Sequence, residues 1–277
     1  MRTRNLNKMT NDEVEAYLAK NDILFVPVGV VETHGGLPVD CETILAEAYA
    51  SRLADAADGL FVTGLPFFYA GCTTTGRATV QVSIEEGVKY LKTLARSFLK
   101  QGFRRQVYLT NHGTAYLTVG TVIRDIFDET GAPLLYIYPQ KYRKPAERNR
   151  QTATDIFCGA YKIMGCLEDI PLNVPEGRSI SYEDKPQWLG FAQDVMTAGP
   201  PSGTLGHLVT EPTEHVPTMV LHSEEEREES AKRGIATIEE AVANIHIDVL
   251  LEKVRKIDKH FQEDVIPRNP WVPMSKA

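Results

Sequence analysis

Apolar residues gather in short runs along the first half of the chain, and longer amphipathic segments separate these runs. The run ILFVPVGVV at 23–31 is apolar throughout and rich in β-branched residues, which is typical of a strand buried on both faces of a parallel sheet. Shorter apolar runs at 60–65, 106–110 and 133–138 predict three further strands.

The segments between these runs have the periodicity and the start signals of helices. Ser83 is followed by Glu85 and Glu86, so we expect it to cap a helix over 83–101. Other helices are expected at 11–20, 43–56, 114–130, 152–164 and 223–252. Strands that alternate with helices form βαβ units, so the predicted fold class is α/β: a three-layer α/β/α sandwich with a mainly parallel central sheet.

The chain has 277 residues, a size at which α/β proteins commonly fold as one unit. We see neither an internal repeat nor a linker in the sequence. Seven of the sixteen prolines fall within 171–217, which predicts long irregular loops there and not a second domain. We therefore expect a single domain over 1–277.

Composition and charge narrow the classes of function. The formal net charge is −7, with 30 basic against 37 acidic residues, and this balance argues against a surface for nucleic acid. The longest apolar run is too short to cross a membrane, and the N-terminal residues lack the apolar core of a secretory signal. We expect a cytoplasmic protein whose partner is a small molecule, with no nucleic acid and no membrane.

Candidate metal ligands follow two of the apolar runs, at the edge where open parallel sheets bind ligands. Glu32 and His34 lie two residues apart and therefore point to the same side of an extended segment. Glu42 stands near the start of the next helix, and His112 follows the run at 106–110. Such a set of oxygen and nitrogen ligands suits Zn or Mn. By spacing alone, the alternative is an acid that caps a helix and a histidine that only makes a hydrogen bond in a turn.

A resemblance adds to this interpretation. The segment VPVGVVETHGGLPVDCETILAEAYA closely resembles the first signature of the creatininase, or creatinine amidohydrolase, family. It places Glu32 and His34 on metal ligands of the family. With a one-residue deletion after Gly36, the resemblance also places Glu42 on the metal-bridging Asp of the family, and leaves Asp40 at a position that is not a ligand.

The segment VYLTNHGTA at 107–115 is similar to the second signature of the family and puts His112 on a metal-binding His. The resemblance extends over most of residues 20–240. It implies the α/β/α fold of the family and a divalent metal, with Zn as the first expectation and Mn as the alternative. It further implies a homo-oligomer, typically a hexamer.

The chain also departs from the family pattern. Thr114 stands where creatininase supplies a glutamate to a second metal, so we expect one metal per chain. Phe157 and Lys162 stand where the family has a histidine and a glutamate. We expect Lys162 to be the catalytic residue, as an electrostatic stabiliser or an acid/base beside the metal. The alternative is a lysine on the solvated face of a helix.

Two segments are candidates for substrate binding. Thr74, Thr75 and Arg77 lie on a polar loop at 71–79 that is long enough to reach the site, although an ordinary turn is the alternative. His207 lies in the segment SGTLGH, which resembles a stretch that closes the site in family members.

The leading hypothesis is a metal-dependent hydrolase in which metal-activated water attacks a carbonyl of a small polar cyclic substrate. The resemblance implies a cyclic amide, but the changes at Phe157 and Lys162 argue against creatinine itself. One alternative is hydrolysis of a C–C bond in a cyclic 1,3-diketone such as a dehydro-inosose, with Lys162 stabilising the enolate. A second alternative is a family member that binds metal and ligand without turnover.

Overall fold

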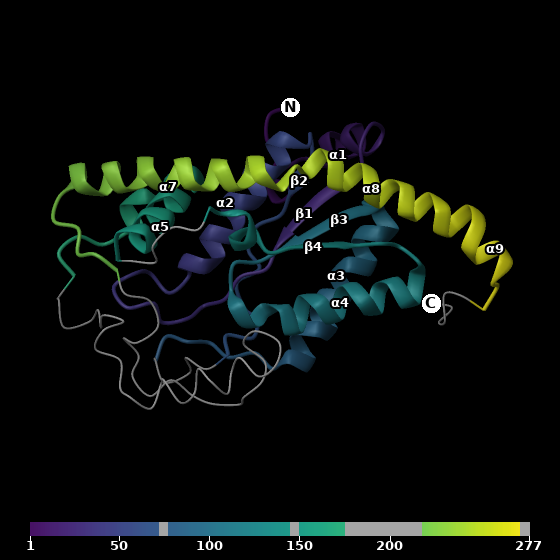
Figure 1. Ribbon diagram of the computed structural model, residues 1–277, viewed down its shortest axis with the longest axis horizontal. Helices are drawn as coiled ribbons and strands as arrows, with labels where there is room; N and C mark the ends of the chain where they lie inside the picture. Colours follow the sequence, from purple (N-terminus) through teal and green to yellow (C-terminus); the bar gives the residue numbers. More distant parts are fainter. Residues whose placement is uncertain (72–76, 145–149, 175–217, 272–277) are drawn as a thin grey trace.

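The computed structural model describes residues 1–71, 77–144, 150–174 and 218–271, and places a four-stranded sheet at its centre (Figure 1). The strands are β1 (Ile23–Pro27), β2 (Leu60–Phe61), β3 (Arg105–Leu109) and β4 (Leu135–Ile137). Their order in the sheet is β2-β1-β3-β4, and all neighbouring strands are parallel. The predicted parallel sheet is confirmed.

Helices follow the strands as the alternating pattern predicts. They are α1 (Asn11–Leu18), α2 (Cys41–Ala56), α3 (Ile84–Gln101), α4 (Tyr116–Thr130), α5 (Arg150–Met164), α7 (Glu224–Ile245), α8 (Ile247–His260) and α9 (Ile266–Arg268). Ser83 caps α3 as expected, because its hydroxyl accepts a hydrogen bond from the backbone N–H of Glu86 at 3.2 Å.

The central strands are buried on both faces, so alternate residues of β1 enter two different cores. Ile23 and Phe25 belong to the core that α2, α5, α7 and α8 cover. Leu24 and Val26 belong to the core that α3 and α4 cover. Figure 1 shows α7 and α8 on one side of the sheet, and α3 and α4 on the other. The three-layer α/β/α sandwich is therefore confirmed.

The first strand is shorter than its apolar run predicts. The run extends to residue 31, but β1 ends at Pro27, which carries no backbone N–H for the ladder. Beyond it, the backbone N–H of Gly29 turns to the carbonyl of Leu65 at 3.0 Å. A Cβ on Gly29 would lie only 2.2 Å from Oγ1 of Thr43, so only glycine allows the chain to approach α2 this closely. This approach directs the residues after β1 toward the start of α2.

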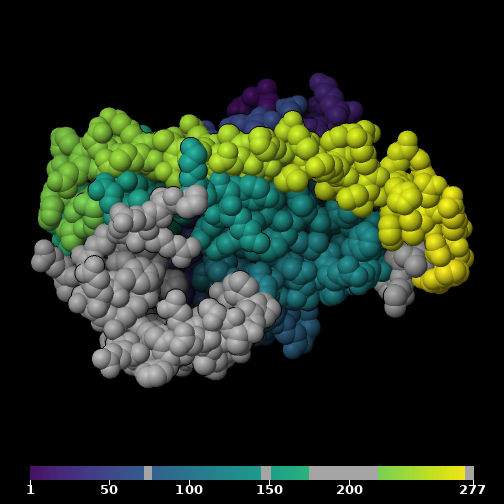
Figure 2. Space-filling view, in the orientation of Figure 1, coloured from purple at the N-terminus to yellow at the C-terminus, as the bar shows by residue number. Residues whose placement is uncertain are grey.

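The charged segment near the C-terminus also differs from the prediction of one helix over 223–252. It forms two helices that meet at His246, where the backbone is left-handed with φ of 49°. Figure 2 shows α7 and α8 as a continuous ridge along one edge of the molecule. Among the helices that the structure describes, none has the length and apolarity required to cross a membrane.

Helices α5 and α7 cross at two glycines. A Cβ on Gly159 would lie 2.4 Å from the backbone of Gly234, and a Cβ on Gly234 would meet the carbonyl oxygen of Asp155. The buried Asp155 carboxylate accepts hydrogen bonds from Ser230 and Arg233 on the facing helix. This contact fixes the rotation of α5 about its axis, and therefore which of its side chains, such as Phe157 and Tyr161, face the core.

Candidate metal centre

Glu32 and His34 lie on the turn that follows β1, and both are almost completely buried. The backbone N–H of Glu32 donates to the carbonyl of Val39 at 2.8 Å, which closes the turn. His34 pairs with Leu37 across the same turn, and its Nδ1 lies 3.2 Å from the carbonyl oxygen of Glu32. With Nδ1 held by the backbone, Nε2 of His34 is directed at the carboxylates.

Glu42 enters the centre from the first turn of α2. The N-terminus of a helix carries partial positive charge, which favours a carboxylate there. Asp40, which precedes the helix, is directed elsewhere: its Oδ1 accepts a hydrogen bond from the hydroxyl of Tyr161 on α5 at 2.5 Å. The structure therefore brings Glu42, and not Asp40, to the other candidate ligands.

His112 reaches the same point from the carboxyl end of β3. Its Nδ1 makes a short contact with Oε2 of Glu42 and lies 3.4 Å from Oε2 of Glu32. Its Nε2 faces the opposite way, 3.0 Å from the carbonyl oxygen of Ala70 and 2.8 Å from Oγ1 of Thr114. Both nitrogens of the ring are thus engaged.

The four side chains form one buried cluster. Nε2 of His34 lies 3.7 Å from Oε1 of Glu42 and 3.9 Å from Oε2 of Glu32. One ligand atom from each of Glu32, His34 and Glu42 lies within 4.8 Å of the other two. The sheet topology explains the convergence, because β1 and β3 are adjacent and parallel, so their carboxyl ends meet at one edge.

The two carboxyl groups have opposite pKa shifts. Burial raises the pKa of Glu32 to about 7, although His112 and His34 partly oppose this rise. Burial acts in the same direction on Glu42, but the facing charges and hydrogen bonds of His112 and His34 outweigh it and hold the pKa of Glu42 well below its ordinary value. Negative charge is therefore concentrated on Glu42.

The pKa values of the two imidazoles are raised in turn by their acidic neighbours. Burial alone would lower the pKa of His34, but Cys41 and Glu42 outweigh it and raise the pKa well above the ordinary value. Burial also opposes the rise for His112, whose pKa is raised chiefly by Glu42. Burial raises the pKa of the Cys41 thiol, and His34 opposes this rise. Without a cation, protons on the imidazoles therefore balance the charge of the carboxylates.

The donor set fits a divalent cation. Two carboxylates and two imidazoles are the ligands that Zn and Mn share, and a cation would offset the cost of burying two acidic groups beside each other. Among the residues that the structure describes, Glu32, His34 and Glu42 form a cluster of this kind, with Nδ1 of His112 directed into it. These residues would hold the metal.

The structure does not bring Lys162 to this centre, in contrast to the expectation from the sequence. Its side chain is 45% exposed, and its ammonium group lies 2.8 Å from Oε1 of Glu228 on α7. Phe157 and Tyr161, four residues apart on α5, occupy the buried face of that helix, so their neighbour Lys162 is rotated outward. The alternative of a lysine on a solvated face is the one that the structure shows.

The predicted substrate-binding residues lie at the margin of the described chain. Arg77 is exposed. Thr74, Thr75 and His207 lie outside the residues that the structure describes, as does most of the expected loop region at 171–217.

Phe157 has a contact that the sequence did not indicate. Its ring meets the ring of His34 edge to face, with the centroids 6.1 Å apart. In the sequence, the signal that points to Phe157 is its departure from the family pattern, which has a histidine at this position. Tyr161, which holds Asp40, gave no signal in the sequence because a tyrosine at helical spacing is ordinary core.

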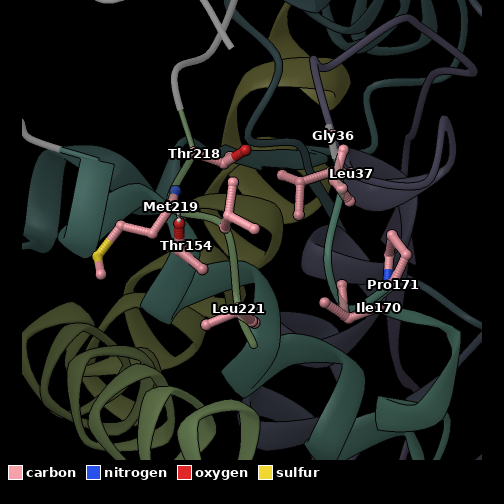
Figure 3. A pocket seen from close by; sticks show the side chains of 10 residues that line it. Gly36, Leu37, Thr154, Ile170, Pro171, Thr218, Met219 and Leu221 are labelled. Carbon is pink, nitrogen blue, oxygen red and sulfur yellow. Dashed lines mark hydrogen bonds between the residues drawn. The ribbon is translucent and has the colours of Figure 1, made fainter. Parts of the chain in front are cut away.

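A small pocket adjoins the turn that carries His34. Figure 3 shows Gly36 and Leu37 on one side of it and Thr154 and Met219 on another. Ile170, Pro171 and Leu221 are among the other residues of its largely apolar lining.

The chain matches a known protein family. The sequence model of the family Creatininase, described as creatinine amidohydrolase, matches residues 7–160. This match covers β1, α2 and β3 together with the segments that follow the two strands, so it includes all four candidate ligands. The chain belongs to the creatininase family.

Solved creatininases share the fold of this family member. A creatininase mutant complexed with creatine is 17% identical, with a TM-score of 0.64 over 91% of this chain and 99% of that one. A manganese form of creatininase is 18% identical, with a TM-score of 0.61 over the same shares of the two chains. At this level of identity the similarity establishes the α/β fold.

A curated relative is 28% identical over 115 residues. It is the 3-dehydro-scyllo-inosose hydrolase of Thermotoga maritima. The match covers 39% of this chain and 36% of that protein.

Proposed function

We propose that this creatininase-family protein is a metal-dependent hydrolase that opens a small polar cyclic substrate. The observation that carries the proposal is the buried cluster of Glu32, His34, Glu42 and His112 at the carboxyl edge of the sheet. A divalent cation, Zn or Mn, bound by these residues would polarise a carbonyl group and lower the pKa of water.

Each side chain of the cluster would have a different role in holding such a cation. Glu42 carries the most persistent negative charge and sits at a helix N-terminus, which fixes its position. The backbone holds one ring nitrogen of each histidine, so the other faces the carboxylates. Phe157 packs against His34 and provides an apolar wall.

The substrate class is proposed on two grounds. Family membership favours a cyclic amide. A second candidate is hydrolysis of a C–C bond in a cyclic 1,3-diketone of the inositol type, and the inosose hydrolase relative supports it. Phe157 also favours the second candidate over creatinine, because an aromatic ring stands where the resemblance expects a histidine for proton transfer. Neither candidate, as proposed, assigns a role to Lys162, whose ammonium group is paired with Glu228 on α7.

A substrate screen tests the proposal. The purified protein, loaded separately with Zn and Mn, is incubated with panels of cyclic amides and keto-inositols, and mass spectrometry detects products that have gained one water. Fragmentation of the product identifies whether a C–N or a C–C bond was broken. Glu32→Gln should abolish turnover, whereas Glu85→Gln, on the exposed start of α3, should not.

The screen also separates the remaining alternatives. Turnover of one panel selects the substrate class. Stoichiometric metal with no product in either panel supports a family member that binds metal and ligand without turnover. Absence of metal from the wild-type protein contradicts the proposal itself. A cytoplasmic location and a homo-oligomer, a hexamer by family resemblance, remain predictions that fractionation and light scattering can test.

A further inference from the structure

The ring of His112 is held at both nitrogens, and the two sides differ in chemistry. Nε2 lies 3.0 Å from the backbone carbonyl oxygen of Ala70, which can only accept a hydrogen bond. Nε2 must therefore carry a hydrogen. In a neutral imidazole the other nitrogen, Nδ1, then has a lone pair, and it faces Glu42 and Glu32.

Thr114 reinforces this arrangement. Its Oγ1 lies 2.8 Å from Nε2 of His112 and 3.4 Å from the carbonyl oxygen of Tyr69. Because the Tyr69 carbonyl can only accept, the Thr114 hydroxyl donates to it and accepts from Nε2–H. The Nε2–H group is thus shared between the Ala70 carbonyl and the Thr114 hydroxyl.

The segment that supplies these acceptors packs closely against Thr114. Gly71 has φ of +84°, and a Cβ there would lie 2.8 Å from Cγ2 of Thr114. Such close packing leaves Thr114 little room to move away from the ring. The Ala70 carbonyl, the Thr114 hydroxyl and the His112 ring therefore form one constrained unit behind the cluster.

We propose that Thr114 is a positioning residue that holds His112 as the Nε2–H tautomer, so that His112 ligates the cation through Nδ1. The inference rests on the proposed function, since it assumes that the cluster binds a divalent metal. Hydrogen bonds to the far nitrogen of a metal-binding histidine orient the ring and raise its affinity for the metal. In this chain a hydroxyl group, with a backbone carbonyl, has that role.

Three variants isolate the hydroxyl group. Thr114→Val keeps the shape of the side chain and its packing on Gly71 but removes the acceptor. Thr114→Ser restores a hydroxyl at the same position. Thr121→Val is the matched control, because Thr121 lies on the exposed face of α4 and donates only to its own helix, at the Leu117 carbonyl.

The first measurement is Zn²⁺ affinity by competition with a chelator. Thr114→Val should weaken binding by about 10- to 100-fold, the range typical of losing such an outer partner. Thr114→Ser should remain close to wild type, and Thr121→Val should be unchanged. Equal affinity in Thr114→Val and wild type would overturn the inference.

The second measurement is independent of affinity and of activity. Long-range ¹H–¹⁵N spectra of the Zn-loaded, ¹⁵N-labelled protein should show His112 protonated at Nε2, with its signals assigned by their absence in His112→Gln. Protonation at Nδ1, with the metal on Nε2, would overturn the inference and leave the metal-dependent function intact. Failure of the wild-type protein to bind Zn²⁺ or Mn²⁺ would overturn both.

Discussion

Glu32 and Glu42 show how strongly the surroundings of a residue decide its charge. Both are buried carboxyl groups in the same cluster, but the pKa of Glu32 is raised to about 7 while that of Glu42 is held well below its ordinary value. The difference arises because Glu42, in the first turn of α2, lies closer to both imidazoles than Glu32 does, so the burial cost of Glu32 is less fully compensated. Glu42 is therefore the better fixed anion for a cation.

We expect Glu42→Gln to remove most of the bound metal and Asp40→Asn to retain it. The reason is geometric: Glu42 lies in the cluster, whereas Asp40 accepts a hydrogen bond from Tyr161, which an asparagine oxygen can also do. Elemental analysis of each variant after gel filtration measures the metal per chain. Loss of metal from Asp40→Asn to the same extent would contradict the assignment.

Metal affinity should fall as the pH decreases. The pKa values of His34 and His112 are raised in the metal-free protein, so both imidazoles hold protons up to a pH above their ordinary pKa of about 6.5. A metal must displace these protons, and its binding should therefore release protons and strengthen with rising pH. Calorimetry in buffers of different ionisation enthalpy counts the protons released. An affinity that is constant from about pH 5.5 to 8 would contradict this expectation.

The sequence predicted the four residues of the cluster better than it predicted their surroundings. Glu32, His34 and His112 follow apolar runs, and parallel strands bring such positions together whatever the details of packing. Lys162 was placed by register along the sequence alone. Its actual direction depends on the rotation of α5, which Asp155 and the glycines at the α7 crossing determine, and no local pattern contains that information.

At the scale of elements, the pairing of α5 with α7 supports one wall of the centre. Phe157 and Tyr161 reach His34 and Asp40 because Gly159 lets the backbones of the two helices come close. The wall therefore depends on a residue that touches neither the cluster nor the pocket.

Gly159→Ala should destabilise the fold. The added Cβ would meet the backbone of α7 at 2.4 Å, and relieving such an overlap typically costs about 1–3 kcal/mol or more. Gly120→Ala on α4 is the matched control, since no atom lies within 4 Å of its added Cβ, and it should stabilise by about 0.5–1 kcal/mol. Urea denaturation measures both changes. A neutral effect of Gly159→Ala would show that the two helices can separate at little cost.

Helix boundaries were predictable only where a local signal exists. Ser83 signals the start of α3, and the structure confirms that it caps this helix. The break between α7 and α8 falls at His246, a left-handed residue in a segment with neither glycine nor proline beside it. Its charged periodicity continues through the break, so the sequence predicts one helix where tertiary packing makes two.

At the scale of the whole molecule, the cluster lies at the carboxyl edge of the sheet. The two faces of this sheet are buried in separate cores. A cation bound there would connect β1, α2 and β3. Binding to the folded state alone shifts the unfolding equilibrium, so metal should act on global stability.

We expect Zn²⁺ or Mn²⁺ to raise the melting temperature of the wild-type protein and to leave that of Glu32→Gln nearly unchanged. At a free metal concentration of about 100 times Kd, the gain in the free energy of unfolding is about 2.7 kcal/mol. Thermal unfolding followed by circular dichroism, with and without chelator, measures it. An equal shift in Glu32→Gln would indicate that the stabilisation comes from metal bound elsewhere.

The parallel pairing of β1 with β3 has a consequence for the order of events in folding. The contact between Glu42 and His112 joins residues 70 positions apart. Most of α2, together with β2, α3 and β3, lies between them in the chain. A non-local parallel pair forms late, after the loss of entropy in closing the intervening chain has been offset by other contacts. Helices can form before the cluster exists, but the cluster cannot precede the β1–β3 pair. The time at which a refolding chain begins to take up Zn²⁺ from a coloured indicator should therefore report when β1 has paired with β3.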